Sequence, residues 1–379
     1  MTNPQLPNPN FTLAAPLQQV DRTYVRFGRT RLSYFGGCDY FRLSTQPALR
    51  RALLTGLKKF GLTVAASRST TGNHEIYERL ESRLAQFFDA PAAVLLSSGY
   101  LGNLALAQAL AGTFSHALID DRAHPSLVDA AVFLDCPVIK FSHRAPADAA
   151  SALRRIGPAA KPFLLTDGLF PHDGAVAPLA EYLRVLPRDG SILVDDAHGA
   201  GVLGKTGQGT IQETGSSRRQ VIQTIALSKA FGAYGGAVLC SHELRERIVA
   251  QSRLFNGNTP LPLPLASAAL KAIDLLSSSK SLRLRLRRNT QSIKAALKKM
   301  GYAVPDTPSP IIPLIPRNPD DVPRMKACFI ADGIFPSFIK YPGAPAQGYF
   351  RFALSSEHTP KQLAALVQSF RELRPLLLH

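Results

Sequence analysis

A chain of 379 residues that is 45% hydrophobic and 19% charged has enough apolar sequence to fold into about two globular domains. Its formal charge of +17 comes from Lys and Arg dispersed along the chain, which argues against nucleic-acid binding, because such faces cluster their basic residues. No stretch approaches the ~20 apolar residues of a membrane span, and the first ten residues lack the basic start and apolar core of a signal peptide. The four cysteines lie far apart, so we expect no metal site and no disulfide framework in a cytoplasmic protein.

The first 45 residues contain several prolines and turn signals, and we expect an irregular arm there. A helical pattern follows, and its clearest part places Ile76, Leu80, Leu84 and Phe88 on one face. Beyond it, short apolar runs typical of strands alternate with helical segments. The runs span residues 92–96, 116–120, 137–141, 162–168, 191–196, 221–227 and 236–241. This alternation predicts an α/β fold with a mostly parallel sheet covered by helices on both faces.

The composition changes near residues 260–270, where a proline-rich stretch leads into a long basic helical segment that runs to about Met300. A mixed strand and helix pattern follows, and the chain ends in a helix over residues 360–377. We therefore expect an arm (1–45), a large domain (46–265) and a smaller C-terminal α/β domain (266–379).

The stretch GAGVLGKT, residues 199–206, has the spacing of a phosphate-binding P-loop and also contains G-x-G-x-x-G. Both motifs require a helix whose N-terminus faces the phosphates. The sequence that follows, GQGTIQETGSS, has three glycines and no helical period. We therefore do not expect a nucleotide-binding P-loop here, and the sequence leaves open whether the stretch has another role.

Polar residues follow the ends of several expected strands. Residues 98–100 open a helix whose free N–H groups could bind phosphate, and His124 follows another strand. Asp195 ends an apolar strand, where a buried carboxylate needs a cationic partner such as a protonated pyridine nitrogen. His198 lies three residues further on, and Lys229 precedes a glycine-dense turn. Because ligands bind at the carboxyl ends of parallel strands, this set predicts a site for pyridoxal 5'-phosphate (PLP).

The sequence resembles the α-oxoamine synthases, which are fold-type I PLP enzymes, over nearly its whole length from about Arg22. The matching stretches are SRSTTGNHEIYERLE, SSGYLGN, IDDRAHPSLVDAA, TDGLFPHDGAVAPL, VDDAHGAGVLGKTGQG and ALSKAFGAYGG, in the order of the family. Near the C-terminus, GYFRFALSSEHT resembles the segment whose arginine binds the substrate carboxylate.

The resemblance implies a fold-type I large domain with a smaller C-terminal domain, and a catalytic set of Lys229, His124, Asp195 and His198. Lys229 would form the Schiff base with PLP, Asp195 would pair with the ring nitrogen, and His124 would stack on the ring. The other implied contacts are His198 for the ring hydroxyl, the Gly99 and Tyr100 amides for the phosphate, and Arg351 for the substrate carboxylate. We add Ser98 and Asn258 as candidate phosphate contacts and Arg22 as a candidate substrate contact.

Two departures from the family pattern concern the cofactor. A threonine that contacts the phosphate is replaced by Ala226, and a serine that helps bind the ring hydroxyl is replaced by Pro171. Because an amide can donate to phosphate as a hydroxyl does, we hypothesise that Asn258, on a loop supplied by the partner subunit, replaces the lost donor.

The resemblance implies a homodimer with a shared active site. The leading expectation is decarboxylative condensation of alanine or a similar amino acid with an acyl thioester, as in 8-amino-7-oxononanoate synthase. The positive charge suits an anionic carrier, either coenzyme A or acyl carrier protein. The alternatives are a ketobutyrate coenzyme A ligase or serine palmitoyltransferase type, an aminotransferase-like biosynthetic relative, and a PLP-fold protein that binds without turnover.

Overall fold

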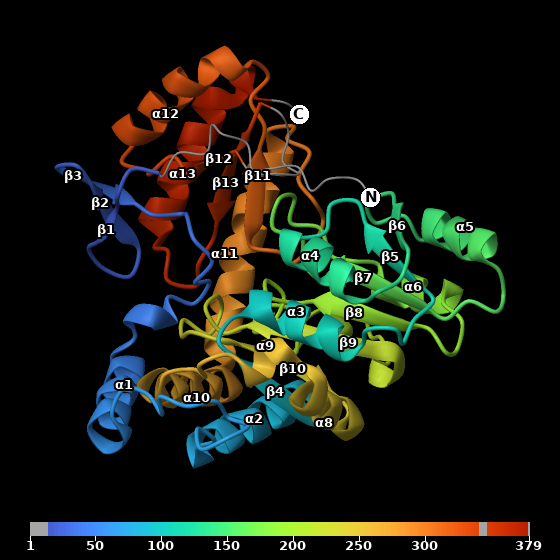
Figure 1. Cartoon of the computed structure of the whole chain (residues 1–379). Coiled ribbons are helices and arrows are strands. Elements are labelled where there is room, and N and C mark those ends of the chain that lie inside the picture. The colour runs from blue at the N-terminus through green and yellow to red at the C-terminus, as the bar shows by residue number, and fades with distance from the viewer. Residues whose placement is uncertain (1–13, 341–346, 378–379) are drawn as a thin grey trace.

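The computed structural model describes residues 14–340 and 347–377, and a seven-stranded sheet lies at its centre (Figure 1). The strands are β4 (Ala92–Leu96), β5 (His116–Asp120), β6 (Val138–Phe141), β7 (Pro162–Asp167), β8 (Ser191–Asp195), β9 (Val221–Ala226) and β10 (Gly236–Cys240). Their order is β4-β10-β9-β8-β7-β5-β6, and β10 runs antiparallel to both neighbours while the other adjoining strands are parallel. The predicted mostly parallel sheet is confirmed, and every strand end lies within one residue of its expected position.

The strands read as continuous apolar runs because helices cover both faces of the sheet. One face packs against α3 (Gly99–Ala109), α4 (Pro125–Phe133) and α8 (His242–Gln251). Within β7, Leu165 faces this layer, whereas Leu164 faces the opposite layer, which contains α5 (Pro146–Ile156) and α6 (Leu179–Val185). The alternation follows from the two-residue period of a strand.

The β4 end of the sheet is covered by three helices that lie together at the lower left of Figure 1. They are α1 (Pro47–Phe60), α2 (Glu75–Phe88) and α10 (Leu263–Ser278). The predicted apolar face of α2 is buried there, since Leu80, Leu84 and Phe88 pack in one core with Leu239 of β10. His74 caps α2 by accepting from the backbone N–H of Ile76.

The C-terminal part forms its own core around a three-stranded antiparallel sheet. Its elements are β11 (Ile311–Leu314), β12 (Phe338–Ile339), β13 (Tyr349–Ala353), α12 (Val322–Ala331) and α13 (Pro360–Leu373), with strand order β11-β13-β12. Buried Phe329, Phe350 and Phe370 share this core with Ile293 from the second half of α11 (Lys280–Lys299). The first half of α11 contributes Leu286 to the core of the large sheet.

The segment after residue 260, which we expected to be one long helix, forms two helices. α10 ends and α11 begins at Ser279, which caps both. Most of the buried side chains of α10 belong to the core of the large sheet. The proposed domain division at 265/266 falls inside α10, and this packing favours a division within α11 instead. We therefore propose that α11 joins the two domains.

The expectation of an irregular N-terminal arm was wrong for part of the described arm, which contains a small antiparallel sheet. Its strands are β1 (Gln18–Gln19), β2 (Tyr24–Phe27) and β3 (Thr30–Ser33). Gly28 has a φ of 58° in the turn between β2 and β3, a left-handed conformation that glycine adopts without strain. Ser33 then bridges to Ile334, so the arm packs on the C-terminal domain.

The remaining elements are short. They are α7 (Thr210–Glu213), α9 (Arg253–Asn256) and the 3-10 helices η1 (Leu43–Thr45), η2 (Arg218–Gln220), η3 (Pro319–Asp321) and η4 (Arg374–Leu376). None of the described helices is long and apolar enough to cross a membrane.

Candidate active site

Lys229 lies just beyond β9 and lines a cavity of about 820 Å³. His124, His198 and Arg351 line the same cavity, so four of the predicted site residues converge although they are distant in sequence. The turn that carries Lys229 is closed by backbone hydrogen bonds from Gly232 to Lys229 (2.9 Å) and from Leu227 to Gly235 (2.9 Å). Gly232 has a φ of 59°, and a side chain there would collide with the backbone of η1. The turn therefore requires glycine.

Asp195 ends β8 and is held by a buried polar network. Its carboxylate accepts hydrogen bonds from Asn103 Nδ2 (2.7 Å), Ser126 Oγ (3.3 Å) and the backbone N–H of Ala197 (3.1 Å). Thr224 in turn donates to Asn103 Oδ1 (2.6 Å), which fixes the amide orientation. All these partners are neutral, so within the described residues the Asp195 carboxylate, only 8% exposed, has hydrogen bonds but no ion pair. A protonated ring nitrogen would supply the missing cation.

A second carboxyl, Asp167, lies beside Asp195 in the sheet, since the two residues are register partners of β7 and β8. Burial, and then the charge of Asp195, raises the pKa of Asp167 well above its usual range. Asp167 accepts the backbone N–H of His124 (2.8 Å). Two adjoining buried carboxyls do not both ionise readily, and Asp167 is the one whose protonated form is favoured.

His124 is the N-cap of α4, and its Nδ1 lies 2.7 Å from Ser126 Oγ. Burial, assisted by Lys229, lowers the pKa of His124, although the nearby Asp195 opposes the shift. The neutral imidazole forms an edge contact with the ring of Tyr100, at 6.1 Å between centroids. A neutral ring at the cavity wall suits the predicted stacking role, because an imidazolium would repel a protonated pyridine ring.

His198 is buried, and its Nδ1 lies 2.7 Å from the hydroxyl of Tyr40. Burial, and then the charges of Lys229 and Arg351, lowers the pKa of His198 well below its ordinary value. Tyr40 belongs to the segment after the N-terminal sheet and is itself buried. The imidazole is therefore neutral and oriented by a tyrosine that sequence reasoning did not assign to the site.

The predicted phosphate site lies at the N-terminus of α3. Ser98 is the N-cap and accepts the N–H of Leu101 (3.2 Å), while the N–H groups of Gly99 and Tyr100 have no acceptor within the helix. The start of β10 packs closely against this N-terminus. A Cβ on Gly236 would lie only 2.4 Å from the Gly99 nitrogen. Only a glycine pair permits so close an approach. The N-terminus of α3 is thus fixed at the edge of the sheet.

Ala226, the first departure from the family pattern, adjoins this N-terminus. It ends β9, is buried, and its Cβ lies 3.0 Å from the position that a Cβ on Gly99 would take. A threonine at 226 would place its hydroxyl beside the first N–H groups of α3. The position therefore matches that of a phosphate donor, and this chain lacks the donor.

Asn258 contacts the segment just before α3 in its own chain, and not in a partner subunit. Its Nδ2 donates to Ser97 Oγ (2.8 Å), one residue before the N-cap. The hypothesis placed Asn258 across a dimer interface, whereas the described chain engages its amide internally. We therefore expect Asn258 to support the phosphate site by positioning residues 97–99.

We predict that Asn258→Ala weakens PLP binding about three- to tenfold, the range for one lost neutral hydrogen bond. Ser97→Ala should produce the same loss, because it removes the other half of the bond. Ala226→Thr should tighten PLP binding slightly. Equilibrium binding of PLP to the apoenzyme measures all three variants. Weaker binding in Asn258→Ala with no change in Ser97→Ala would show instead that the amide reaches the phosphate directly.

Arg351 lies on β13 and brings the C-terminal domain to the cavity. Its backbone N–H donates to Ser337 O (2.9 Å), and its guanidinium reaches the sulfur of Cys38 (3.9 Å). Arg22 is placed differently. It forms an ion pair with Glu357 (2.7 Å) and is not among the residues that line the cavity around Lys229. The structure therefore brings Arg351, and not Arg22, to the site, and the role of Arg22 in substrate binding stays a prediction without support here.

Pro171, the second departure, lines the same cavity beside His172. Proline offers no donor, so a ring hydroxyl at this wall would depend on His198 alone. His172 Nε2 is buried, forms no hydrogen bond with the residues that the structure describes, and lies 3.7 Å from Asp173. Burial lowers the pKa of His172, and its ring is therefore neutral.

Four functional residues were not singled out from the sequence: Asn103, Ser126, Thr224 and Tyr40. The first two lie within the stretches SSGYLGN and IDDRAHPSLVDAA that carry the family resemblance. Asn103 is fully buried on α3, although an asparagine inside an apolar helix is uncommon without a partner. In the sequence the available signal was an asparagine within the largely apolar run LGNLALAQALAG, and its partner could not be read from the sequence.

The residues present fit PLP. The cavity offers an amine from Lys229, the α3 N-terminus lies at the same sheet edge, and Asp195 lacks only a cation. The three requirements of the cofactor, namely an amine for its aldehyde, donors for its phosphate and an anion for its ring nitrogen, are met by different elements of one sheet edge.

Comparisons with known proteins agree with this geometry. The family model for aminotransferase class I and II matches residues 39–370. An 8-amino-7-oxononanoate synthase from Thioalkalivibrio sulfidiphilus is 32% identical over 334 residues, covering 87% of this chain and 85% of the relative. Another from Trichlorobacter lovleyi is 30% identical over 373 residues, covering 94% of each chain.

Solved structures share the fold. An 8-amino-7-oxononanoate synthase from Francisella tularensis is 26% identical with a TM-score of 0.77, over 91% of this chain and 98% of that one. A serine palmitoyltransferase from S. paucimobilis, solved with bound PLP, is 24% identical with a TM-score of 0.88, over 94% and 91%. At this identity, the likeness to the serine palmitoyltransferase shows a shared fold and nothing more.

Proposed function

The chain belongs to the aminotransferase class I and II family, and we propose that it condenses alanine or a similar small amino acid with an acyl thioester. A bond forms between the α-carbon of the amino acid and the acyl carbon. The thioester C–S bond breaks, the carrier leaves as a thiol, and the amino-acid carboxylate leaves as carbon dioxide. The convergence of Lys229, His124, His198 and Arg351 on one cavity is the observation that carries the proposal.

The predicted cofactor, PLP, and the predicted fold-type I architecture are confirmed by the family match and by the solved neighbours. When bound, PLP supplies an electron-withdrawing ring that stabilises negative charge on the α-carbon. Asp195 would hold the proton on the ring nitrogen, His124 would support the ring face, and the α3 N-terminus would hold the phosphate. His198, oriented by Tyr40, would hold the ring hydroxyl.

The substrate groups have partners in the same cavity. The Lys229 amine would take and return the proton at the α-carbon, and Arg351 would hold the amino-acid carboxylate. Arg122 and Lys140 also line the cavity and add two cations to it. An anionic carrier, either coenzyme A or acyl carrier protein, suits this charge.

The active site would be shared between two copies of the chain. Support comes from α4, whose exposed face carries Val128 (43%), Val132 (76%) and Phe133 (38%), and Val128 also lines the cavity. A partner subunit covering this face would bury the apolar patch beside the site. Light scattering after size exclusion should give the mass of two chains, and the mass of one chain would contradict the arrangement.

The reaction is tested by measuring thiol release with a panel of acyl thioesters and amino acids. We expect thiol release that depends on the amino acid and is matched by an equal amount of carbon dioxide. Formation of a keto acid without thiol release would assign the chain to the aminotransferase-like alternative. PLP binding without either product would favour a protein that binds without turnover.

A further inference from the structure

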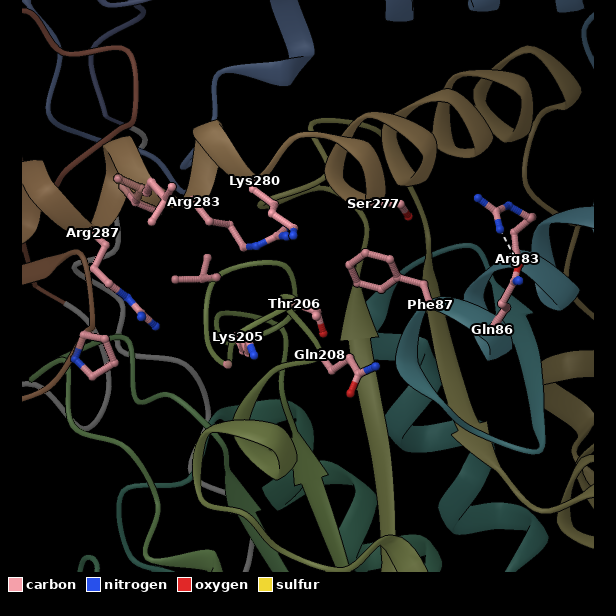
Figure 2. Close-up of a pocket in the computed structure, with 15 residues that line it drawn as sticks. Arg83, Gln86, Phe87, Lys205, Thr206, Gln208, Ser277, Lys280, Arg283 and Arg287 are labelled. Carbon is pink, nitrogen blue, oxygen red and sulfur yellow. Dashed lines mark hydrogen bonds between the residues drawn. The ribbon is translucent and has the colours of Figure 1, made fainter.

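A second cavity, of about 590 Å³, lies between α2, α11 and the loop that contains GAGVLGKT, and we call it the basic pocket (Figure 2). Of the fifteen described residues that line it, none is acidic and five are cationic. The cations are Arg83, Lys205, Lys280, Arg283 and Arg287. Figure 2 shows Lys280, Arg283 and Arg287 reaching from α11 toward the loop that carries Lys205.

The positive charge in the basic pocket is only partly compensated. Arg83 pairs with Asp274 (2.8 Å), and Arg287 lies 4.0 Å from Glu213. The side chains of Lys205 and Lys280 form no hydrogen bond or ion pair with any described residue, and both residues are exposed and line the pocket. At least two cations of the pocket, Lys205 and Lys280, therefore have no anionic partner among the described residues.

Arg283 is the most constrained cation of the basic pocket. Its Nη1 donates to the carbonyl of Leu276 (2.6 Å), so the guanidinium is held in place by a neutral group, and no carboxylate among the described parts of the chain pairs with it. Burial, and then the like charge of Arg287, lowers the pKa of Arg283. Crowded like charges of this kind raise the energy of the free protein, and a bound anion would relieve the repulsion.

The loop itself does not form a P-loop, in agreement with the prediction from its sequence. The helix that follows it, α7, is four residues long. The N–H groups of Gly204 and Thr206 already donate to Glu213 Oε2 (2.7 Å) and Gln212 Oε1 (2.8 Å). Backbone amides that a P-loop would offer to phosphate are thus used within the loop, and any anion here must be held by side chains.

Apolar side chains line the basic pocket together with the cations. They are Phe87 of α2, Val202 of the loop, and Leu284 and Leu286 of α11, and Phe87 packs edge-on against Phe231 at 5.9 Å between ring centroids. The pocket therefore combines cationic and apolar side chains, and its volume lies in the range of small-molecule sites. A single inorganic ion would leave the apolar side chains uncovered.

We propose that the basic pocket binds an organic phosphate whose phosphate groups contact Lys205, Lys280 and Arg283 while its apolar part covers Phe87. The nucleotide phosphates of a free nucleotide and those of coenzyme A share this chemistry. Because side chains hold the phosphates, binding requires no magnesium. This gives GAGVLGKT a role that its motif alone does not predict.

Isothermal titration calorimetry on the PLP-saturated holoenzyme tests the proposal, with ADP, coenzyme A and inorganic pyrophosphate as probes in EDTA. We expect ADP or coenzyme A to bind more tightly than pyrophosphate. The double variant Lys205→Gln/Lys280→Gln should weaken that binding at least about tenfold, as for lost hydrogen bonds to charged groups. Lys299→Gln, an exposed lysine on the same helix outside the basic pocket, is the matched control and should leave binding unchanged.

Steady-state kinetics distinguish the two possible ligands, the coenzyme A part of the thioester substrate and a free nucleotide. If the pocket holds the nucleotide of the thioester carrier, the double variant also raises the thioester KM; if it holds a free nucleotide, KM is unchanged while ADP binding is lost. Either result supports the proposal. Failure of both organic phosphates to bind overturns it, as does binding that survives the double variant, or ADP binding that is lost in Lys140→Gln of the catalytic cavity. Because the titration needs no turnover, its outcome is independent of the proposed reaction.

Discussion

Replacing Lys229 with alanine should lower turnover by about 10³-fold or more, because the variant loses both the amine that binds the cofactor aldehyde and the group that moves the α-carbon proton. The change removes one partly buried side chain at the cavity wall and leaves the turn bonds of Gly232 and Leu227 in place. We therefore expect the variant to fold, to bind PLP without a covalent link and to lack activity.

Borohydride reduction of the holoenzyme, followed by peptide mass analysis, checks the assignment directly. The wild-type protein should lose its visible absorbance band and carry the added cofactor mass on Lys229. Lys140→Ala is the matched control, since it removes a lysine from the same cavity and should keep the covalent label. A label found on Lys140, or on Lys205 in the basic pocket, would contradict the site.

The arrangement of the site was predictable because a parallel sheet brings strand ends together. Once the runs at 191–195 and 221–226 were recognised as parallel strands, the residues after them had to meet at one edge. The antiparallel direction of β10 was not predicted, although the sequence held a signal for it. The glycine-dense turn after Lys229 is too short for the crossover that a parallel pair needs, so the chain returns antiparallel beside β9.

Contacts between residues that are far apart in the chain could not be predicted from the sequence. Asn103 reaches Asp195 across 92 positions, and Tyr40 reaches His198 across 158. Neither pair has a local signature, since each depends on how a helix or the arm docks on the sheet. The same limit applies to the basic pocket. The sequence shows Lys205 in a motif without its helix, and only the fold places the cations of α11 beside it.

Asp195→Asn should reduce activity by about 10³-fold, because the substitution keeps the size of the side chain and removes the charge that stabilises a protonated ring nitrogen. At ~1.4 kcal/mol per decade, this corresponds to about 4 kcal/mol of lost transition-state stabilisation, a magnitude typical of removing one partner from a buried charge pair. The new amide would also place an N–H₂ or a carbonyl opposite Asn103 and Ser126, which donate to the carboxylate at 2.7 and 3.3 Å. Its carbonyl can accept both, whereas its NH₂ group then faces the backbone N–H of Ala197, which loses its acceptor. The loss of one neutral hydrogen bond costs about 1–3 kcal/mol, and we expect the fold to survive.

Asp167→Asn is the matched control, because Asp167 is the register partner of Asp195 one strand away. Burial and the charge of Asp195 raise the pKa of Asp167 well above its usual range, which favours its neutral form. An asparagine there mimics that neutral form, and its carbonyl can still accept the N–H of His124. We therefore expect activity within about tenfold of wild type, the cost of a perturbed neutral hydrogen bond. Steady-state thiol release and PLP affinity of both variants measure the contrast. If Asp167→Asn proved the more damaging substitution, the negative charge would reside on β7, and the pairing of Asp195 with the cofactor would be wrong.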